Sequence, residues 1–126
     1  MNPVPHPSLA LTIGEPAGIG CDVALMAWHK RHELELPPFY LIADPAHVEA
    51  RARLLGITAP VMVVAPEQAG AVFRQSLPVS SLSERATAAP GHPDETSAAV
   101  ALASIRRAVR DTIEGKAAAV VTNPIA

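Results

Sequence analysis

Short apolar runs alternate with helix-like segments along this chain, and that alternation constrains the fold more than any other feature. The runs, at residues 9–13, 39–43, 60–64 and 117–122, are continuous and bounded by Gly, Pro or Asn, as expected of buried strands. Helical segments separate them: one from residue 19 to about 29, one over 45–55, and one over 93–114. Alternation of this kind predicts an α/β fold, with a mainly parallel sheet and helices on both faces.

Two of the expected helices carry clear start and stop signals. Asp44 precedes Pro45, a capping residue followed by proline at the first helical position, and Gly56 suits a left-handed ending. The long segment starts near Pro93, with acidic residues in its first turn, and ends at Gly115. Its apolar residues recur at steps of four, three, four and four: Ala98, Leu102, Ile105, Val109 and Ile113. This spacing predicts an amphipathic helix whose apolar face they form.

The remaining stretches give weaker signals. The first helix is expected to have an apolar face formed by residues at helical spacing, namely Ile19, Val23, Met26 and Ala27. Residues 66–73 suit a short helix, and residues 77–80 suit a short strand at the edge of the sheet. Residues 1–7 carry Pro at alternating positions, which predicts a loose lead-in.

Length and composition exclude several classes of protein. With 126 residues the chain suits one domain, and 49% apolar against 17% charged residues argues against disorder. The formal charge of −2 comes without a basic stripe interleaved with aromatics, which argues against a nucleic-acid surface. No apolar run approaches the roughly 20 residues that span a bilayer, and a single cysteine excludes an internal disulfide. We therefore expect a soluble α/β domain in a reducing compartment.

The most informative segment is residues 14–20, Gly-Glu-Pro-Ala-Gly-Ile-Gly. It follows an expected strand and opens an expected helix, where free backbone amides favour anions. Aligning Gly18 and Gly20 with a dinucleotide fingerprint puts Val23 where the third glycine belongs, and no Gly-Lys-Ser/Thr follows as in a P-loop. Two interpretations stay open. The segment is either a tight turn that packs a helix against a strand, or a ligand site in which Glu15 meets a cation or a hydroxyl.

Other polar residues also allow two interpretations. Thr122 and Asn123 end the last strand, where they suit either a turn or the binding of a hydroxyl or phosphate. His29 and His32 lie one helical turn apart, which suits a solvated helix end better than a metal site. Cys21 follows the glycine segment with no histidine paired to it along the sequence, so we expect it to pack rather than react.

Four segments, taken in order, carry a resemblance to one enzyme family. The first and most specific is the glycine segment 14–20, with Asp22 just beyond it. The later ones are residues 43–45 at a strand end, Pro90-Gly91 before the long Ala-rich helix, and residues 118–125, which end in Val-Thr-Asn-Pro-Ile. From about residue 8 to residue 126, these segments resemble the amino-terminal part of the 4-hydroxythreonine-4-phosphate dehydrogenase family.

The resemblance implies a fold similar to isocitrate and isopropylmalate dehydrogenases, of which residues 1–126 would form an incomplete domain. It also implies an NAD-dependent enzyme that requires a divalent metal such as Zn, Mg or Co. Such enzymes oxidise the hydroxyl of a phosphorylated hydroxy-amino acid, 4-phosphooxy-L-threonine, in pyridoxal 5′-phosphate biosynthesis. They are cytoplasmic homodimers. The candidates for lining the ligand cleft are Gly14, Glu15, Gly18, Gly20, Thr122 and Asn123.

Length sets this chain apart from that family, whose members are much longer. Their metal ligands, catalytic residues and NAD-binding residues come later in the sequence, so we assign no catalytic residue and no metal ligand here. We expect an amino-terminal fragment that is inactive by itself. Two alternatives stay open: a stand-alone anion- or nucleotide-binding α/β module, and a non-catalytic structural half. Because the strand over 117–122 is apolar on both faces, we also expect an uncovered surface there, with self-association or marginal stability.

Overall fold

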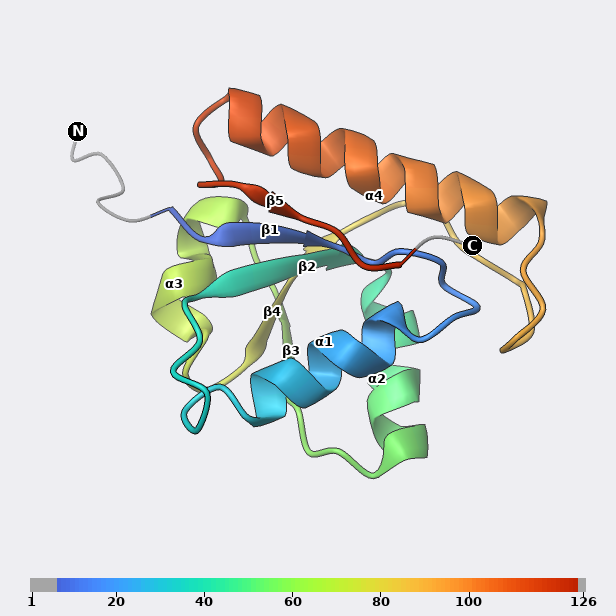
Figure 1. Ribbon diagram of the computed structural model, residues 1–126, viewed down its shortest axis with the longest axis horizontal. Helices are drawn as coiled ribbons and strands as arrows, with labels where there is room; N and C mark the ends of the chain where they lie inside the picture. Colours follow the sequence, from blue (N-terminus) through green and yellow to red (C-terminus); the bar gives the residue numbers. More distant parts are fainter. Residues whose placement is uncertain (1–6, 125–126) are drawn as a thin grey trace.

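The structure, a computed structural model, describes residues 7–124 and shows the expected alternation of strands and helices (Figure 1). Most of the expected lead-in at 1–7 lies outside the described residues. The elements in chain order are β1 (Leu9–Thr12), α1 (Gly20–His29), β2 (Phe39–Ala43), α2 (Pro45–Leu55), β3 (Val61–Val63), the 3-10 turn η1 (Pro66–Gln68), α3 (Ala69–Val72), β4 (Leu77–Ser81), α4 (Glu95–Ile113) and β5 (Val120–Val121).

The strands form a five-stranded sheet in the order β3-β4-β2-β1-β5, and every pairing is parallel. Figure 1 shows α4 on one face of the sheet and α1 and α2 on the other. The helix α4 packs over β1, β2 and β5. The predicted α/β class, with a parallel sheet and helices on both faces, is therefore confirmed. Among residues 7–124, no helix combines the length and the apolar character needed to cross a membrane.

The core is centred on β2, which is buried along its whole length between β1 and β4. Its Tyr40 is fully buried, and the hydroxyl donates a hydrogen bond of 2.8 Å to the buried carboxylate of Asp111 on α4. The indole Nε1 of Trp28 donates to the carbonyl oxygen of Phe73 at 2.8 Å, and the Phe39 and Phe73 rings meet edge to face. The few aromatic residues therefore tie α1, β2, α3 and α4 to one another.

The helix starts follow the signals in the sequence. The Asp44 carboxylate accepts from the Ala46 amide at the start of α2, which ends at Gly56 with a φ of +69°. At α4, the Asp94 carboxylate accepts from the Thr96 and Ser97 amides while Ser97 Oγ accepts from the Asp94 amide. These caps satisfy amide groups that the helix itself leaves without partners.

The prediction of an edge strand at 77–80 is wrong. The strand β4 lies between β2 and β3, and β3 forms the edge. Proline cannot donate to a sheet ladder, so Pro78 favoured an edge position. The chain instead returns from β3 through η1 and α3 to the inner side of β3, and Pro78 is buried opposite Met62.

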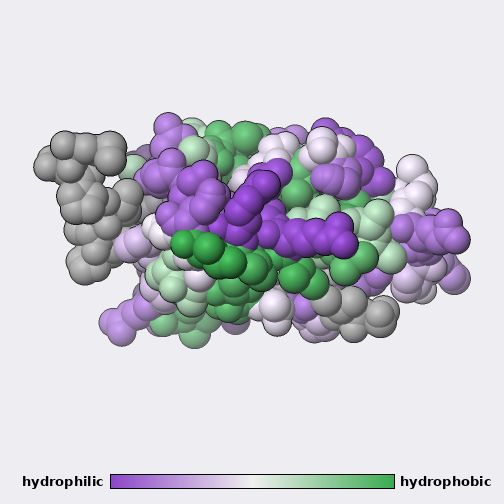
Figure 2. All heavy atoms as spheres, turned by 90° about the horizontal axis from the view of Figure 1, so that it is seen from above, coloured by the Kyte–Doolittle hydropathy of each residue, from purple (hydrophilic) through white to green (hydrophobic). Residues whose placement is uncertain are grey.

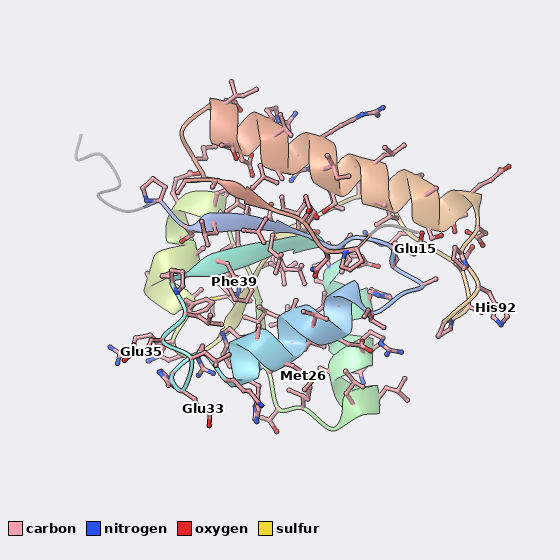
Figure 3. The ribbon with its side chains drawn as sticks, in the orientation of Figure 1. Glu15, Met26, Glu33, Glu35, Phe39 and His92 are labelled. Atoms are coloured by element: carbon pink, nitrogen blue, oxygen red, sulfur yellow. The ribbon has the colours of Figure 1, made fainter. Side chains whose placement is uncertain are left out.

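The predicted apolar face of α1 is also wrong. Ile19, Val23 and Met26 are 62%, 48% and 52% exposed, and Met26 lies on the outer side of α1 (Figure 3). The buried face is formed by Gly20, Cys21, Ala24, Leu25 and Trp28. This face combines the small Gly20 and Ala24, which let the helix approach the strands closely, with the large Leu25 and Trp28, so the spacing that begins at Ile19 indicated the wrong side.

In α4, too, the buried face differs from the face predicted from the sequence. The face against the sheet consists mainly of small residues, namely Ser97, Val100, Ala101, Ser104 and Ala108, together with Asp111. The residues predicted to form the apolar face are on another side of the helix, where Leu102, Val109 and Ile113 are exposed.

The last strand, β5, occupies an edge of the sheet and pairs only with β1. It covers residues 120–121, less than the run 117–122 expected from the sequence. Val121 is 43% exposed, so the expected uncovered surface is present among the described residues. Its consequence, self-association or marginal stability, stays a prediction.

Candidate functional site

A tight turn connects the carboxyl end of β1 to the start of α1. Gly14 has a φ of +70°, in the left-handed region that glycine tolerates without strain. A Cβ there would lie 2.5 Å from the carbonyl oxygen of Pro124, and a Cβ on Gly20 would collide with the carbonyl oxygen of Ile13. The Gly18 amide donates to the Glu15 carbonyl oxygen at 2.8 Å and closes the turn. Gly14 and Gly20 are therefore required for the close approach of three chain segments.

Hydrogen bonds join the end of β5 to this turn. The Glu15 amide donates to the carbonyl oxygen of Pro124 at 3.0 Å. The Asn123 side chain, 7% exposed, donates from Nδ2 to the carbonyl oxygen of Thr12 at 2.9 Å, and its amide donates to Thr12 Oγ1 at 3.2 Å. Asn123 also packs against Gly14 and Gly20, while Thr122 beside it is exposed. The structure thus brings together the predicted residues of the two motifs at one edge of the sheet.

Glu15 is buried in this turn, and Figure 3 shows it at the edge where β1 ends. Its Oε1 accepts a hydrogen bond from the Ala17 amide at 3.1 Å. None of the ion pairs among residues 7–124 includes it. The amides of Glu15, Ala17 and Gly18 already have acceptors, so these three groups are not available to an anion. The carboxylate keeps acceptor capacity for a hydroxyl or an ammonium group.

Ser104, in the middle of α4, joins this site and was missed in the sequence. Its hydroxyl is fully buried, donates to the carbonyl oxygen of Ile42 at 2.8 Å and accepts from the Ile13 amide at 3.0 Å. The pairing of β1 with β2 ends at Thr12 and Ile42, so Ser104 provides the next hydrogen bonds where the two strands diverge. Ser97, Ala101, Ser104 and Ala108 form a stripe of small residues, and that stripe was the available signal.

A hollow of about 500 Å³ lies on the outer side of the turn, between residues 16–19, α2 and the loop 88–91. At its wall, the Arg51 guanidinium binds the Asp22 carboxylate through two hydrogen bonds of 2.9 and 2.6 Å, which joins α2 to α1. His47 lies beside this pair, and its Nε2 is buried with no hydrogen-bond partner among residues 7–124. Burial lowers the pKa of His47 below the usual value of 6.5, so neutral imidazole is favoured.

The other sequence candidates lie apart from this edge. His29 and His32 are exposed at the end of α1 and beyond it, and His92 is on the exposed loop before α4 (Figure 3). Within residues 7–124, no group of three or more His, Cys, Asp or Glu side chains is arranged to hold a metal ion. Cys21 is buried, and desolvation, with a smaller contribution from Asp22, raises its pKa to about 12. It therefore packs in the core, as its sequence context predicts.

The sequence of this chain matches one known protein family. The sequence profile of the family described as pyridoxal phosphate biosynthetic protein PdxA matches residues 35–126, most of the chain. The chain belongs to this family. The predicted resemblance to this family is thereby confirmed. The match includes Thr122 and Asn123, whereas the glycine segment at 14–20 lies before it.

Curated members of the PdxA family align along nearly the whole chain. The 4-hydroxythreonine-4-phosphate dehydrogenase of Bradyrhizobium diazoefficiens is 51% identical over 94% of this chain, and that of Methylorubrum populi is 49% identical over 94%. The aligned regions are 36% and 34% of those proteins. The chain therefore spans about a third of the length of the curated relatives it matches.

Solved structures of the same enzyme share the fold. The 4-hydroxythreonine-4-phosphate dehydrogenase from Burkholderia phymatum superimposes with a TM-score of 0.81 over 96% of this chain and 37% of its own. The enzyme from Klebsiella pneumoniae gives 0.79 over 95% of this chain and 38% of its own. At 20% and 21% identity, these matches establish the fold of PdxA dehydrogenases for this chain.

Proposed function

We propose that this chain forms one wall of the substrate cleft of a dehydrogenase that acts on 4-hydroxythreonine-4-phosphate. The observation that carries the proposal is the joining of the two motifs. The turn that bears Glu15 is bonded to the end of β5, which bears Thr122 and Asn123. These residues lie at the carboxyl ends of parallel strands, where ligands of open α/β sheets bind. Relatives that share up to 51% identity with this region carry the name of that enzyme.

The polar groups at this edge suit a substrate rich in hydroxyl and ammonium groups. The Glu15 carboxylate is an acceptor without a cationic partner among the described residues, and Thr122 offers an exposed hydroxyl that both donates and accepts. Asn123 is already bonded to Thr12, so its role is to hold the β5 end against the turn. We assign substrate contact to Glu15 and Thr122 and positioning to Asn123 and the glycines.

The enzyme would use NAD and a divalent metal, with the metal polarising the substrate hydroxyl when it is bound. Residues 7–124 hold no cluster of metal-ligating side chains, so the metal does not fit this part of the chain. The resemblance also favours a cytoplasmic homodimer. The substrate cleft would be completed by polypeptide that the relatives carry outside the matched third.

A chimera tests the proposal. The matched region of the Bradyrhizobium diazoefficiens relative is replaced by this chain, and NADH formation is measured with 4-hydroxythreonine-4-phosphate and a divalent metal. We expect turnover that is lost on chelation, with the intact relative as the positive control. The isolated chain should give no NADH. A folded chimera without activity, or turnover by the isolated chain, would contradict the proposal.

A further inference from the structure

One peptide group at the end of β1 is held from two sides by side chains. It joins Thr12 to Ile13, and it comes just before the turn that carries Glu15. From the end of β5, Asn123 Nδ2 donates to the carbonyl oxygen of Thr12 at 2.9 Å. From α4, Ser104 Oγ accepts from the Ile13 amide at 3.0 Å. The oxygen and the N–H of this peptide group are therefore bonded to side chains from two different parts of the chain.

Ser104 also connects this peptide group to the neighbouring strand. Its hydroxyl donates to the carbonyl oxygen of Ile42 at 2.8 Å, where the pairing of β1 with β2 ends. Figure 2, which looks down on α4, shows a continuous surface of hydrophilic and hydrophobic side chains over the sheet. Ser104 is fully buried beneath that surface, so water does not readily replace its hydrogen bonds. Loss of the hydroxyl would remove the acceptor of one buried backbone group and the donor to another.

The position of Glu15 depends on this peptide group. Only Gly14 separates Ile13 from Glu15 along the chain. The Ile13 carbonyl oxygen packs against Gly20, where an added Cβ would collide with it. On the other side of Gly14, the Glu15 amide is bonded to the carbonyl oxygen of Pro124 at 3.0 Å. A shift of the β1 end would therefore be transmitted to the Glu15 side chain rather than absorbed by a loose loop.

We propose that Ser104 is a positioning residue of the substrate cleft, which holds the end of β1 so that the Glu15 carboxylate meets the substrate. This inference rests on the proposed function, because Ser104 affects the substrate only through Glu15. Ser104 does not touch the substrate, since it is fully buried and both of its hydrogen bonds go to backbone groups. A misplacement of about 1 Å at a binding group can cost on the order of 100-fold in rate, so a small shift of β1 is enough.

Steady-state kinetics of the chimera separate positioning from stability. We expect Ser104→Ala to raise KM for 4-hydroxythreonine-4-phosphate about tenfold, because a displaced carboxylate weakens substrate binding. A loss of stability alone would lower the folded fraction, and therefore kcat, while KM stayed the same. Tyr40→Phe is the matched control, since it also removes a buried hydrogen bond between β2 and α4 but lies nearer the amino end of β2. It should leave KM unchanged.

A double-mutant cycle shows whether Ser104 acts through Glu15. Glu15→Gln should raise KM to a similar extent as Ser104→Ala. Adding Ser104→Ala to Glu15→Gln should raise KM by less than about twofold more, because the carboxylate is already lost. An unchanged KM in an active Ser104→Ala chimera, or independent effects of the two substitutions, would overturn the inference and leave the proposed function standing. A folded parent chimera without activity would instead contradict the proposed function.

Amide hydrogen exchange in the 126-residue chain tests the hold on β1 without any activity. The Ala10 amide, which donates to the carbonyl oxygen of Ala119 at 3.0 Å, is the internal reference on the same strand. Ser104→Ala should raise the ratio of the Ile13 to the Ala10 exchange rate at least about tenfold, because local opening at Ile13 no longer breaks a hydrogen bond. Tyr40→Phe should leave this ratio unchanged. An unchanged ratio in folded Ser104→Ala protein would overturn the inference, whatever the activity of the chimera.

Discussion

Replacing Gly20 with alanine tests the close packing on which the candidate site depends. The added Cβ would collide with the carbonyl oxygen of Ile13 and lie 3.0 Å from the Asn123 Cβ. The first neighbour is backbone and cannot move without shifting β1. Overpacking of this kind costs about 1–3 kcal/mol, and the helix propensity of alanine returns less than about 1 kcal/mol at the first position of α1. We expect Gly20→Ala to lower the free energy of unfolding by about 2 kcal/mol.

Urea unfolding followed by circular dichroism measures this change, and Gly18→Ala is the matched control. Gly18 lies in the same turn, but its added Cβ would approach nothing closer than 3.3 Å, and its φ is not positive. We expect Gly18→Ala to change the free energy of unfolding by less than about 0.5 kcal/mol, as is usual for surface substitutions. For a domain of this size, the Gly20→Ala loss corresponds to a melting temperature lower by roughly 8 °C. Equal stability of the two variants would refute the packing argument.

Three further predictions concern buried polar groups. Tyr40→Phe should cost about 1–3 kcal/mol in urea unfolding, because it leaves the buried Asp111 carboxylate without its hydroxyl donor; an unchanged midpoint would show that Asp111 is solvated. Cys21, whose pKa burial raises to about 12, should resist thiol reagents at mildly alkaline pH and react once urea unfolds the chain; fast labelling of folded protein would contradict its burial. His47 has a lowered pKa, so the unfolded chain binds more protons and the free energy of unfolding should fall as pH drops through 6.5. Replacing it with glutamine should flatten that slope, and an unaltered slope would assign the pH dependence to other groups.

The strand and helix order could be predicted because each signal is local. Asp44, Pro45 and Gly56 fix the ends of α2 through hydrogen bonds and dihedral angles that involve only near neighbours. Such features need no knowledge of the rest of the chain.

The packed faces of α1 and α4 could not be predicted, because they depend on which helix must approach the sheet most closely. Ala24 and Ser104 are on the buried sides, whereas Met26 and Leu102 are exposed. In α4 the spacing of the large apolar residues therefore indicated the outer side, and in α1 the spacing that begins at Ile19 passed over the buried Leu25 and Trp28. The position of β4 was missed for a related reason. The chain returns from β3 to the inner side of the sheet, and this path depends on tertiary packing that Pro78 alone does not indicate.

The candidate site was predicted in part. The sequence indicated Glu15, Thr122 and Asn123 because they end strands, and parallel strands end at one edge. It did not indicate Ser104, which reaches the same edge from the middle of α4. A serine inside a helix indicates such a role only when the fold is known, because the fold shows that the serine lies beside strand ends whose backbone groups have no partner in the sheet.

The central claim is that the carboxyl edge of this sheet contacts substrate in a PdxA-family dehydrogenase. Its most direct test is kcat/KM for 4-hydroxythreonine-4-phosphate in the chimera carrying Thr122→Val, which removes one exposed hydroxyl and keeps the side-chain shape. Thr58→Val is the control, because Thr58 is also exposed and lies in the loop between α2 and β3. We predict a fall of about tenfold for Thr122→Val, the value of one hydrogen bond to a ligand, and no change for Thr58→Val. An unchanged kcat/KM in the folded Thr122→Val chimera would contradict the claim.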